Sequence, residues 1–339
     1  MQATRLRRLP ARGSRAQTGL LSTVLRRTRR APEPYRWADT HNMKYELYHD
    51  ESKENGYWHG ILLVPVEKKS SLLELLVEAR TNANYSYPLG IKKVRKPGQI
   101  YNIAESWVQI GVAALISSSK GLPIPISLAK REGGKPQYGF FRELIGAKFI
   151  AFREKDNLAK MSNYLDYGGK IETTFRMGLK GGMHFLGNDV EPISIEKMHF
   201  DGYEHQSRHI DANRIVKRLY GLRSYCSISD SDDLIDDRSS DHTRKGSQDY
   251  EDCQLLQLTD LLIGCFRSVL ECSTRPIHKK LAFSIESIVQ RYFEGYARMQ
   301  NSRWRNSFCI SQCYLDANGW NFETIEYKKE NDEQQLSLF

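Results

Sequence analysis

The segment from Asp252 to Leu270, DCQLLQLTDLLIGCFRSVL, constrains the fold of this chain more than any other part of it. Apolar side chains occupy nearly all sides of a helix formed by this segment, which is typical of a helix buried in a core. Asp260 lies in the middle of the apolar run. Because an unpaired buried carboxylate costs several kcal/mol, we expect a metal ion, an N–H donor or an arginine such as Arg267 beside it. Asp260 alone indicates a metal site and an internal salt bridge about equally.

Strands and helices alternate along much of the remaining sequence. The alternating stretch Lys44–Tyr48 and the apolar run YWHGILLVPV predict a hairpin. Further strands are predicted at 148–154, 192–202 and in SYCSIS, and further helices at 72–80, 208–222 and 280–299. The acidic, Ser-rich stretch 229–249 is predicted to be a mobile loop. This order of elements predicts an α/β protein with a mixed sheet flanked by helices.

Two further acidic side chains lie at the ends of predicted strands. Asp50 ends the first strand and Asp201 ends the strand at 192–202. Because adjacent strand residues point to opposite faces, only one of Asp50 and Glu51 can face a given site. We choose Asp50 and keep Glu51 as a further candidate ligand. His199 shares a strand face with Asp201. Each acid on its own also fits a simple turn.

Asp50, Asp201 and Asp260 together fit one mechanism. Hard divalent cations such as Mg²⁺ or Mn²⁺ prefer carboxylate oxygens. Two such ions close together can activate a water molecule and stabilise the leaving oxygen during phosphodiester cleavage. Strand ends and one late helix can bring acids that are distant in sequence to such a site. His205, in the predicted loop after Asp201, and His242 are candidate proton shuttles, although each residue of this kind is more often just a polar loop residue.

The opening YHDES, the middle HFDGYEH and the closing LLQLTDLLIGCFR resemble the bacterial "domain of unknown function 3800" family. That family typically opens with Asp-Glu-Ser-Gly, closes with a Leu-Gln-Leu-Ala-Asp-Leu-Leu helix, and is grouped with the ribonuclease-H-like fold. The resemblance runs from about Lys44 to Leu270. It implies a ribonuclease-H-like mixed sheet with helical insertions, in which Asp50, Asp201 and Asp260 take the acidic positions.

This chain departs from the family pattern in two places. Lys53 follows Ser52 where Gly is expected. No clear match is present for the helix Glu that ribonuclease-H-like enzymes usually add, and the candidates are Glu74, Glu78 and Glu105. We divide the chain into a leader at 1–42, a ribonuclease-H-like domain at 43–300 with a helical insertion at about 82–182, and a C-terminal extension at 301–339.

Most of the formal net charge of +9 lies in the first 42 residues. They hold ten Arg, no Lys and two acids, so they carry +8 and leave +1 for residues 43–339. The net charge is therefore weak evidence for nucleic-acid binding. Three interpretations of 1–42 stay open: a disordered basic arm, a targeting leader, or upstream sequence translated from a start placed too early. The change from Arg-only to free Lys usage at Met43 favours the third.

Composition also bears on location. No run approaches the roughly 18 apolar residues that span a bilayer, so a membrane protein is not expected. The six Cys show no convincing zinc spacing and are predicted to be reduced thiols in a cytoplasmic protein. A basic string formed by Lys92, Lys93, Arg95 and Lys96 could contact phosphates or could be an ordinary solvated loop.

The chain ends with Gln335, Leu336, Ser337, Leu338 and Phe339. This sequence is similar to the pentapeptide with which bacterial DNA-processing proteins dock on the replication sliding clamp. A polar spacer, KKENDEQ, precedes it, so the peptide can extend from the domain. Leu338 and Phe339 would anchor in an apolar pocket while Gln335 hydrogen-bonds at the rim. The alternative is an apolar end that packs on its own domain.

The sequence thus predicts a metal-dependent nuclease that cleaves DNA or an RNA–DNA hybrid and is recruited to the clamp, in repair or in defence against foreign DNA. The missing helix Glu and Lys53 leave a second hypothesis open, a non-catalytic adaptor with the same fold that binds the clamp or another protein.

Overall fold

A computed structural model describes residues 43–54, 56–116, 130–132, 135–137, 146–155, 167–186, 193–201, 215, 226–229, 234–243, 250–271, 275–296, 307–316, 319–323, 325 and 327. All of them belong to one compact unit, His41–Phe339. The interpretations of residues 1–42, of His205 and of the peptide at 335–339 lie outside this described part of the chain.

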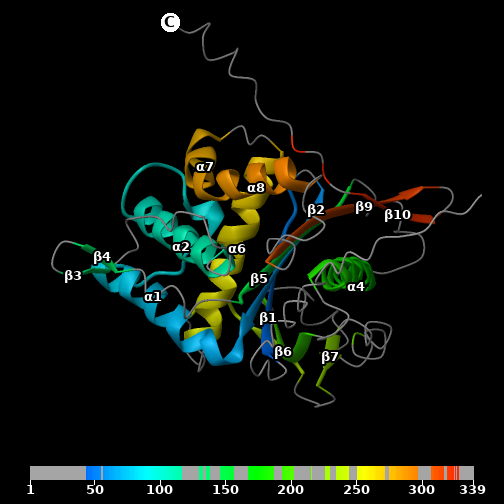
Figure 1. The fold of residues 1–339 in the computed structure, drawn as a ribbon, viewed down its shortest axis with the longest axis horizontal. Helices are drawn as coiled ribbons and strands as arrows, with labels where there is room; N and C mark the ends of the chain where they lie inside the picture. The colour runs from blue at the N-terminus through cyan, green and yellow to red at the C-terminus, as the bar shows by residue number, and fades with distance from the viewer. Residues whose placement is uncertain are drawn as a thin grey trace, which may run out of the picture. The chain divides into compact units, whose positions relative to one another are not determined.

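The main sheet has eight strands in the order β10-β9-β5-β2-β1-β6-β7, with β8 also paired to β6 (Figure 1). Its strands are β1 (Lys44–Ser52), β2 (Tyr57–Pro65), β5 (Lys148–Glu154), β6 (Ile193–Asp201), β7 (Cys226–Ile228), β8 (Ile235–Arg238), β9 (Phe308–Asp316) and β10 (Gly319–Glu323). A separate two-stranded sheet joins β3 (Lys130–Glu132) and β4 (Lys135–Gln137).

Strand directions make this a mixed sheet. β1, β2 and β5 form an antiparallel meander. On one side of it β6 runs parallel to β1, and β7 and β8 run parallel to β6. On the other side β9 runs parallel to β5, and β10 returns antiparallel to β9. The predicted α/β class with a mixed sheet is confirmed.

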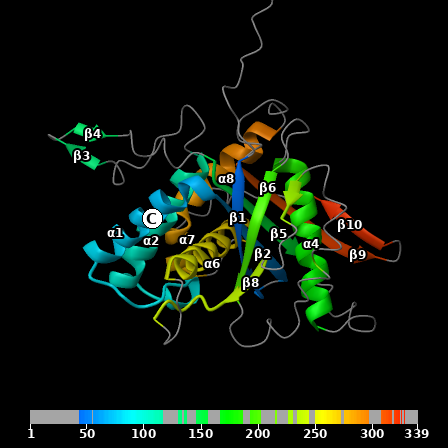
Figure 2. The same ribbon diagram turned by 90° about the horizontal axis from the view of Figure 1, so that it is seen from below.

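Six α-helices are described: α1 (Lys69–Asn82), α2 (Gln99–Ile116), α4 (Tyr167–Leu186), α6 (Tyr250–Leu270), α7 (Pro276–Leu281) and α8 (Phe283–Tyr296). In Figure 2, α4 lies on one side of the sheet, and α6 lies on the other side with α1, α2 and α7. Because successive side chains of a strand point to opposite faces of the sheet, each face packs against its own layer of helices. Leu47 and Ile61 pack in the core beside α4, whereas Tyr48 and Leu62 pack in the larger core beside α6.

Helix α6 lies at the centre of the larger core. Seventeen of its residues are buried, as its apolar sequence predicts. Glycine on neighbouring elements permits this close packing, because a Cβ on Gly60 of β2 would lie 2.7 Å from the Cβ of Ile263. Among the described helices, α6 alone has the length and composition that would also suit a membrane span. Of the most apolar stretch of this helix, 83% is buried inside the protein, and the core helices of soluble proteins have the same length and composition.

The structure corrects three predicted boundaries. The insertion predicted at 82–182 contains β5, an interior strand paired with both β2 and β9. The extension predicted to begin at 301 contains β9 and β10, which belong to the main sheet. The loop predicted at 229–249 contains β8, because Leu234 is buried and Ile235–Arg238 pairs with β6. In all three cases the pairing partner is distant in sequence.

Candidate functional site

Asp50 and Asp201 lie on neighbouring parallel strands and on the same sheet face. The register joins Tyr48 to His199 and His49 to Phe200. Asp50 therefore shares its face with Tyr48, and Asp201 shares its face with His199. That face is the one covered by α6, because Tyr48 packs in the core beside this helix. Parallel pairing thus brings together two acids that are far apart in sequence.

Asp260 reaches the same place from α6. Its carboxyl group lies within hydrogen-bonding reach of that of Asp50, and the charges of Asp50 and Asp201 act on each other as well. Its Oδ2 accepts a 2.9 Å hydrogen bond from the backbone N–H of Ile91. The partners of Asp260, which is half-buried, are therefore an N–H donor and a neighbouring carboxyl group. Arg267 instead donates to Ser52 Oγ at 2.7 Å and pairs with Glu54 Oε2 at 2.8 Å.

Burial and the charges of neighbouring acids make Asp50 and Asp260 hard to ionise. Desolvation, followed by the charges of Asp260 and Asp201, raises the pKa of Asp50 well above its usual range. Desolvation also raises the pKa of Asp260, although the Ile91 N–H and Lys92 partly offset the rise. Asp201 accepts a hydrogen bond from the N–H of Ser240 at 3.3 Å. A divalent cation near them would favour their ionised form, but among the described residues the group whose ligand atoms all lie within 4.8 Å of one another is a different one, described below.

The loop between α1 and α2 is tied to α6 by side chains that the sequence did not single out. Gln257 Oε1 accepts hydrogen bonds from the N–H of Leu89 at 2.8 Å and from Arg80 Nη2 at 2.5 Å. Gln257 Nε2 donates to the Ser240 carbonyl at 2.6 Å. Gln257 and Asp260, one turn apart on α6, thus hold two N–H groups of one loop, at Leu89 and Ile91. In the sequence, the only feature that pointed to Gln257 was the resemblance of LLQLTDLL to the closing helix of the family.

Gly90 lies between these two anchored residues. A Cβ at this position would lie 2.7 Å from Asp260 Oδ2, closer than non-bonded atoms approach. The backbone at Gly90 is extended and open to any residue, so the requirement for glycine comes from the carboxylate. The loop and the acidic site are therefore built as one unit.

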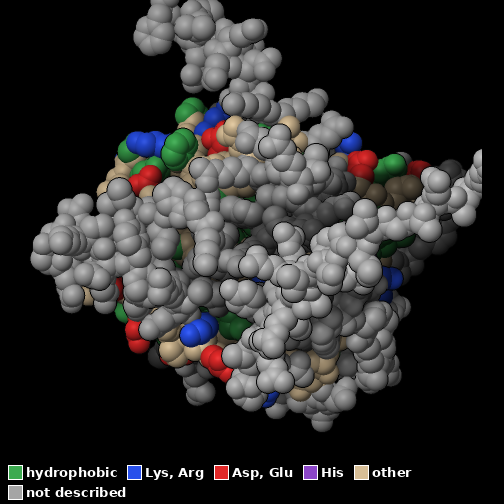
Figure 3. Space-filling model, viewed as in Figure 1, with side chains coloured by type: hydrophobic (Ala, Val, Ile, Leu, Met, Phe, Trp, Pro, Cys, Tyr) green, Lys and Arg blue, Asp and Glu red, His purple; other side chains and the backbone are tan. Residues whose placement is uncertain are grey.

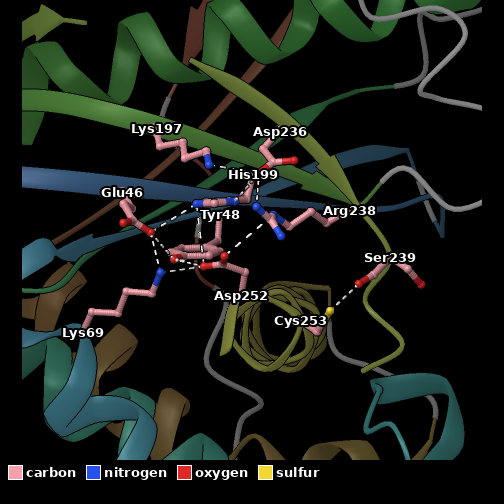
Figure 4. Close-up of polar contacts among 10 residues, drawn as sticks. All are labelled: Glu46, Tyr48, Lys69, Lys197, His199, Asp236, Arg238, Ser239, Asp252 and Cys253. Atoms are coloured by element: carbon pink, nitrogen blue, oxygen red, sulfur yellow. Dashed lines mark hydrogen bonds and ion pairs between the residues drawn. The ribbon is translucent and has the colours of Figure 1, made fainter. Parts of the chain in front are cut away.

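A second charged cluster lies on the same face of the sheet (Figure 4). Glu46 of β1, His199 of β6 and Asp252 of α6 offer ligand atoms within 4.8 Å of one another and form a possible metal-binding group. Lys69 Nζ, however, lies 2.8 Å from Glu46 Oε2 and 2.7 Å from Asp252 Oδ1. A divalent ion would have to displace this ammonium group.

The lowered pKa values of Glu46 and Asp252 agree with carboxylate charges that Lys69 and His199 already compensate. Burial opposes ionisation of Glu46, but hydrogen bonds from His199, Lys69 and Tyr48 lower its pKa. The pKa of Asp252 is likewise lowered against burial, by His199 and Lys69. The Tyr48 hydroxyl lies 2.6 Å from Glu46 Oε2 and 2.8 Å from Asp252 Oδ1, so it can donate to either. The cluster clamps the first turn of α6 to β1 and β6.

Several predicted site residues lie elsewhere. Glu51 points to the opposite face from Asp50 and pairs with Lys53 at 3.1 Å, so the structure does not bring it to the side of the sheet on which Asp50 lies. His242 uses Nε2 to donate to the Ser86 carbonyl and Nδ1 to accept from Gln257, which leaves neither ring nitrogen for proton transfer. Glu74 and Glu78 are exposed on α1, and Glu105 accepts a hydrogen bond from Tyr101 at 2.7 Å.

The predicted basic string lies beside the acidic site. Lys92, Lys93, Arg95 and Lys96 are all exposed. Lys93 Nζ donates to the Pro88 carbonyl at 3.0 Å, and Lys92 directly follows Ile91.

Comparison with known proteins gave no match among family models, curated proteins or solved structures.

Proposed function

We propose that this chain is a metal-dependent nuclease that cleaves phosphodiester bonds in DNA or in an RNA–DNA hybrid. The observation that carries the proposal is the convergence of Asp50, Asp201 and Asp260 on one side of the sheet. They come from two strands and a helix that are widely separated in sequence. The raised pKa of Asp50 and of Asp260 supports the proposal, because a bound cation would offset the cost of ionising these acids.

We further propose that the fold is ribonuclease-H-like and that the chain belongs to the "domain of unknown function 3800" family. The strand order β5-β2-β1-β6-β7 supports this, because an antiparallel meander is continued by strands parallel to β1. Such a core has its acids at the ends of β1 and of the strand beside it. Asp50 and Asp201 hold those positions, and Asp260 comes from the late helix.

The proposed cofactor is Mg²⁺ or Mn²⁺. Three carboxylates with no sulfur ligand among them favour a hard cation. Such an ion would supply charge for activating water and for stabilising the leaving oxygen. The chain itself positions the acids: Ile91 N–H orients Asp260, and Ser240 N–H orients Asp201.

The activity test uses the full chain with Mg²⁺ or Mn²⁺ on labelled single-stranded, duplex and hybrid substrates. Asp50→Asn and Asp260→Asn are each expected to abolish cleavage. Glu74→Gln, which removes an exposed carboxylate on α1, is the matched control and is expected to leave cleavage unchanged. Cleavage that survives in both Asp variants would refute the assignment of the site.

We also propose that residues 335–339 recruit the chain to the bacterial sliding clamp, in the cytoplasm. The support is the sequence QLSLF and its polar spacer. Tethering would raise the effective concentration at DNA of a domain that is nearly neutral in charge. Deletion of 335–339 is expected to abolish binding to a purified clamp without changing cleavage of free DNA. Clamp binding that persists after the deletion would exclude this peptide as the docking site.

A non-catalytic adaptor remains the second candidate, favoured by one observation. The Ile91 N–H and Asp50 already give Asp260 polar partners without any metal. Mn²⁺ binding separates the two functions. A Mn²⁺-dependent rise in melting temperature that is lost in Asp50→Asn supports the enzyme, and no rise at millimolar Mn²⁺ supports the adaptor.

A further inference from the structure

A cavity of about 850 Å³ lies between the segment after Ile91 and helix α7. Nine residues line it: Glu54, Lys92, Val94, Arg95, Pro97, Arg275, Pro276, Ile277 and Lys280. They come from the end of the β1–β2 hairpin, from the loop before α2, and from α7. On the face drawn in Figure 3, Lys or Arg side chains lie beside hydrophobic ones over the region of α7. Of the basic string noted in the sequence, Lys92 and Arg95 line this cavity.

The charge around the cavity is strongly positive. Four of the lining residues are cationic, and Glu54 is the single acid among them. Glu54 Oε2 is paired with Arg267 Nη2 at 2.8 Å, so its charge is already compensated. Lys92 and Arg95 are exposed on the loop side, and Arg275 and Lys280 are exposed on the α7 side. An anion that entered the cavity would meet cations on two opposite walls.

The apolar residues that line the cavity are held in place by packing and by a hydrogen bond between α7 and the loop. Val94 is buried, and Ile277 packs against the larger core. The buried His278 donates through Nε2 to the Val94 carbonyl at 2.9 Å, which fixes α7 to the loop. Lys280 Nζ lies 5.4 Å from the centre of the Tyr101 ring. The two walls are therefore held at a fixed separation, with apolar surface between the cations.

The cavity adjoins the acidic site. Lys92 lines it and is close enough to Asp260 to lower the pKa of that acid. Arg267, which holds Glu54 at the rim, also donates to Ser52, two residues beyond Asp50. A nucleic-acid strand whose phosphate lay at the three acids would thus have its neighbouring nucleotides within reach of this cavity.

We propose that the cavity binds an unpaired segment of the nucleic-acid strand next to the scissile phosphate. The cations bind its phosphates, and Val94, Pro97, Pro276 and Ile277 contact its sugars and bases. This inference rests on the proposed nuclease function and names its preferred substrate. The volume lies within the range of about 300–1,000 Å³ of pockets that enclose small ligands. This volume is on the scale of a single nucleotide, which favours an unpaired strand over a duplex as the occupant.

Binding is tested on the full chain carrying Asp50→Asn, in EDTA, so that no cleavage occurs. Fluorescence anisotropy measures affinity for a labelled single-stranded DNA and for its duplex over a series of salt concentrations. Arg275→Gln and Lys280→Gln are each expected to weaken single-strand binding and to reduce the slope of log K against log salt by about 0.7, the value for one lost phosphate contact. Lys279→Gln removes the same charge from an exposed position of α7 outside the cavity and is expected to change neither.

Single-strand binding by Arg275→Gln and Lys280→Gln that equals binding by Lys279→Gln would overturn the proposal. Equal losses on the duplex would overturn the assignment to an unpaired strand. The wild-type cleavage assay separates this proposal from the proposed function. Metal-dependent cleavage that Lys280→Gln leaves unchanged refutes the cavity alone, whereas cavity-dependent binding without cleavage refutes the nuclease alone. A chain that binds neither substrate in EDTA and cleaves neither with Mg²⁺ or Mn²⁺ refutes both.

Discussion

Gly90→Ala offers a direct test of how the acidic site is built. The new methyl group would lie 2.7 Å from Asp260 Oδ2, which already accepts the N–H of Ile91 at 2.9 Å. Either the carboxylate or the loop must move, and in both cases this hydrogen bond is weakened. A buried polar group that loses its partner costs about 1–3 kcal/mol. The lower entropy of the unfolded Ala chain returns roughly 0.4–1 kcal/mol, so we expect a net loss of about 1–2 kcal/mol.

Equilibrium urea denaturation measures this loss, and Gly181→Ala is the matched control. Gly181 lies within α4, where an added Cβ meets no atom within 4 Å. There the exchange is expected to stabilise the protein by roughly 0.5–1 kcal/mol. In an Asp260→Ala background the clash is absent, so Gly90→Ala is expected to lose its cost, as a double-mutant cycle would show. A Gly90→Ala protein as stable as Gly181→Ala would refute the close approach.

Asp50→Asn is expected to stabilise the metal-free protein more at about pH 8 than at about pH 4. Because the folded-state pKa of Asp50 is raised, its contribution to stability is present below the ordinary value of 3.8 and is lost as pH rises through the folded-state pKa. Melting temperatures at both pH values measure this, and a pH-independent difference would contradict it. Lys69→Met is expected to cost about 3 kcal/mol in urea denaturation, the lower end for a broken buried ion pair, because Lys69 and Glu46 retain 17% and 16% exposure. No loss would mean that Lys69 does not balance Glu46 and Asp252. Gln257→Leu is expected to speed amide hydrogen exchange at Leu89, and unchanged exchange would show that this anchor is dispensable.

The sequence predicted well what depends on local pattern. The apolar surroundings of Asp260 correctly indicated a buried helix and a partnered carboxylate. Alternation along β1 correctly separated Asp50 from Glu51 as candidates for one face. Keeping Glu51 as a further ligand went against that same rule, and its pairing with Lys53 on the other face shows why.

What the sequence did not predict depends on pairing between distant segments. Nothing near Phe308 signals that β9 will pair with β5, so the sheet was expected to end too early. Leu234 and Ile235 lie within an acidic, Ser-rich stretch and become a strand only because β6 is beside them. Glu46 was visible at the correct spacing from Asp50 on β1. Its partners His199, Lys69 and Asp252, however, come from three other elements.

The two acidic clusters on this sheet face differ in how they are balanced, and this difference decides where a divalent cation would bind. Glu46 and Asp252 have Lys69 between them, so a metal ion there must displace an ammonium group held by two short contacts. Among the described residues, no lysine or arginine lies within ion-pair distance of Asp50 or Asp260, and burial raises the pKa of both. Oδ2 of Asp260 accepts the N–H of Ile91, and the carboxyl group also lies within hydrogen-bonding reach of Asp50. A divalent cation at the cluster of Glu46, His199 and Asp252 would thus compete with Lys69, and under the proposed function the three aspartates are the preferred site.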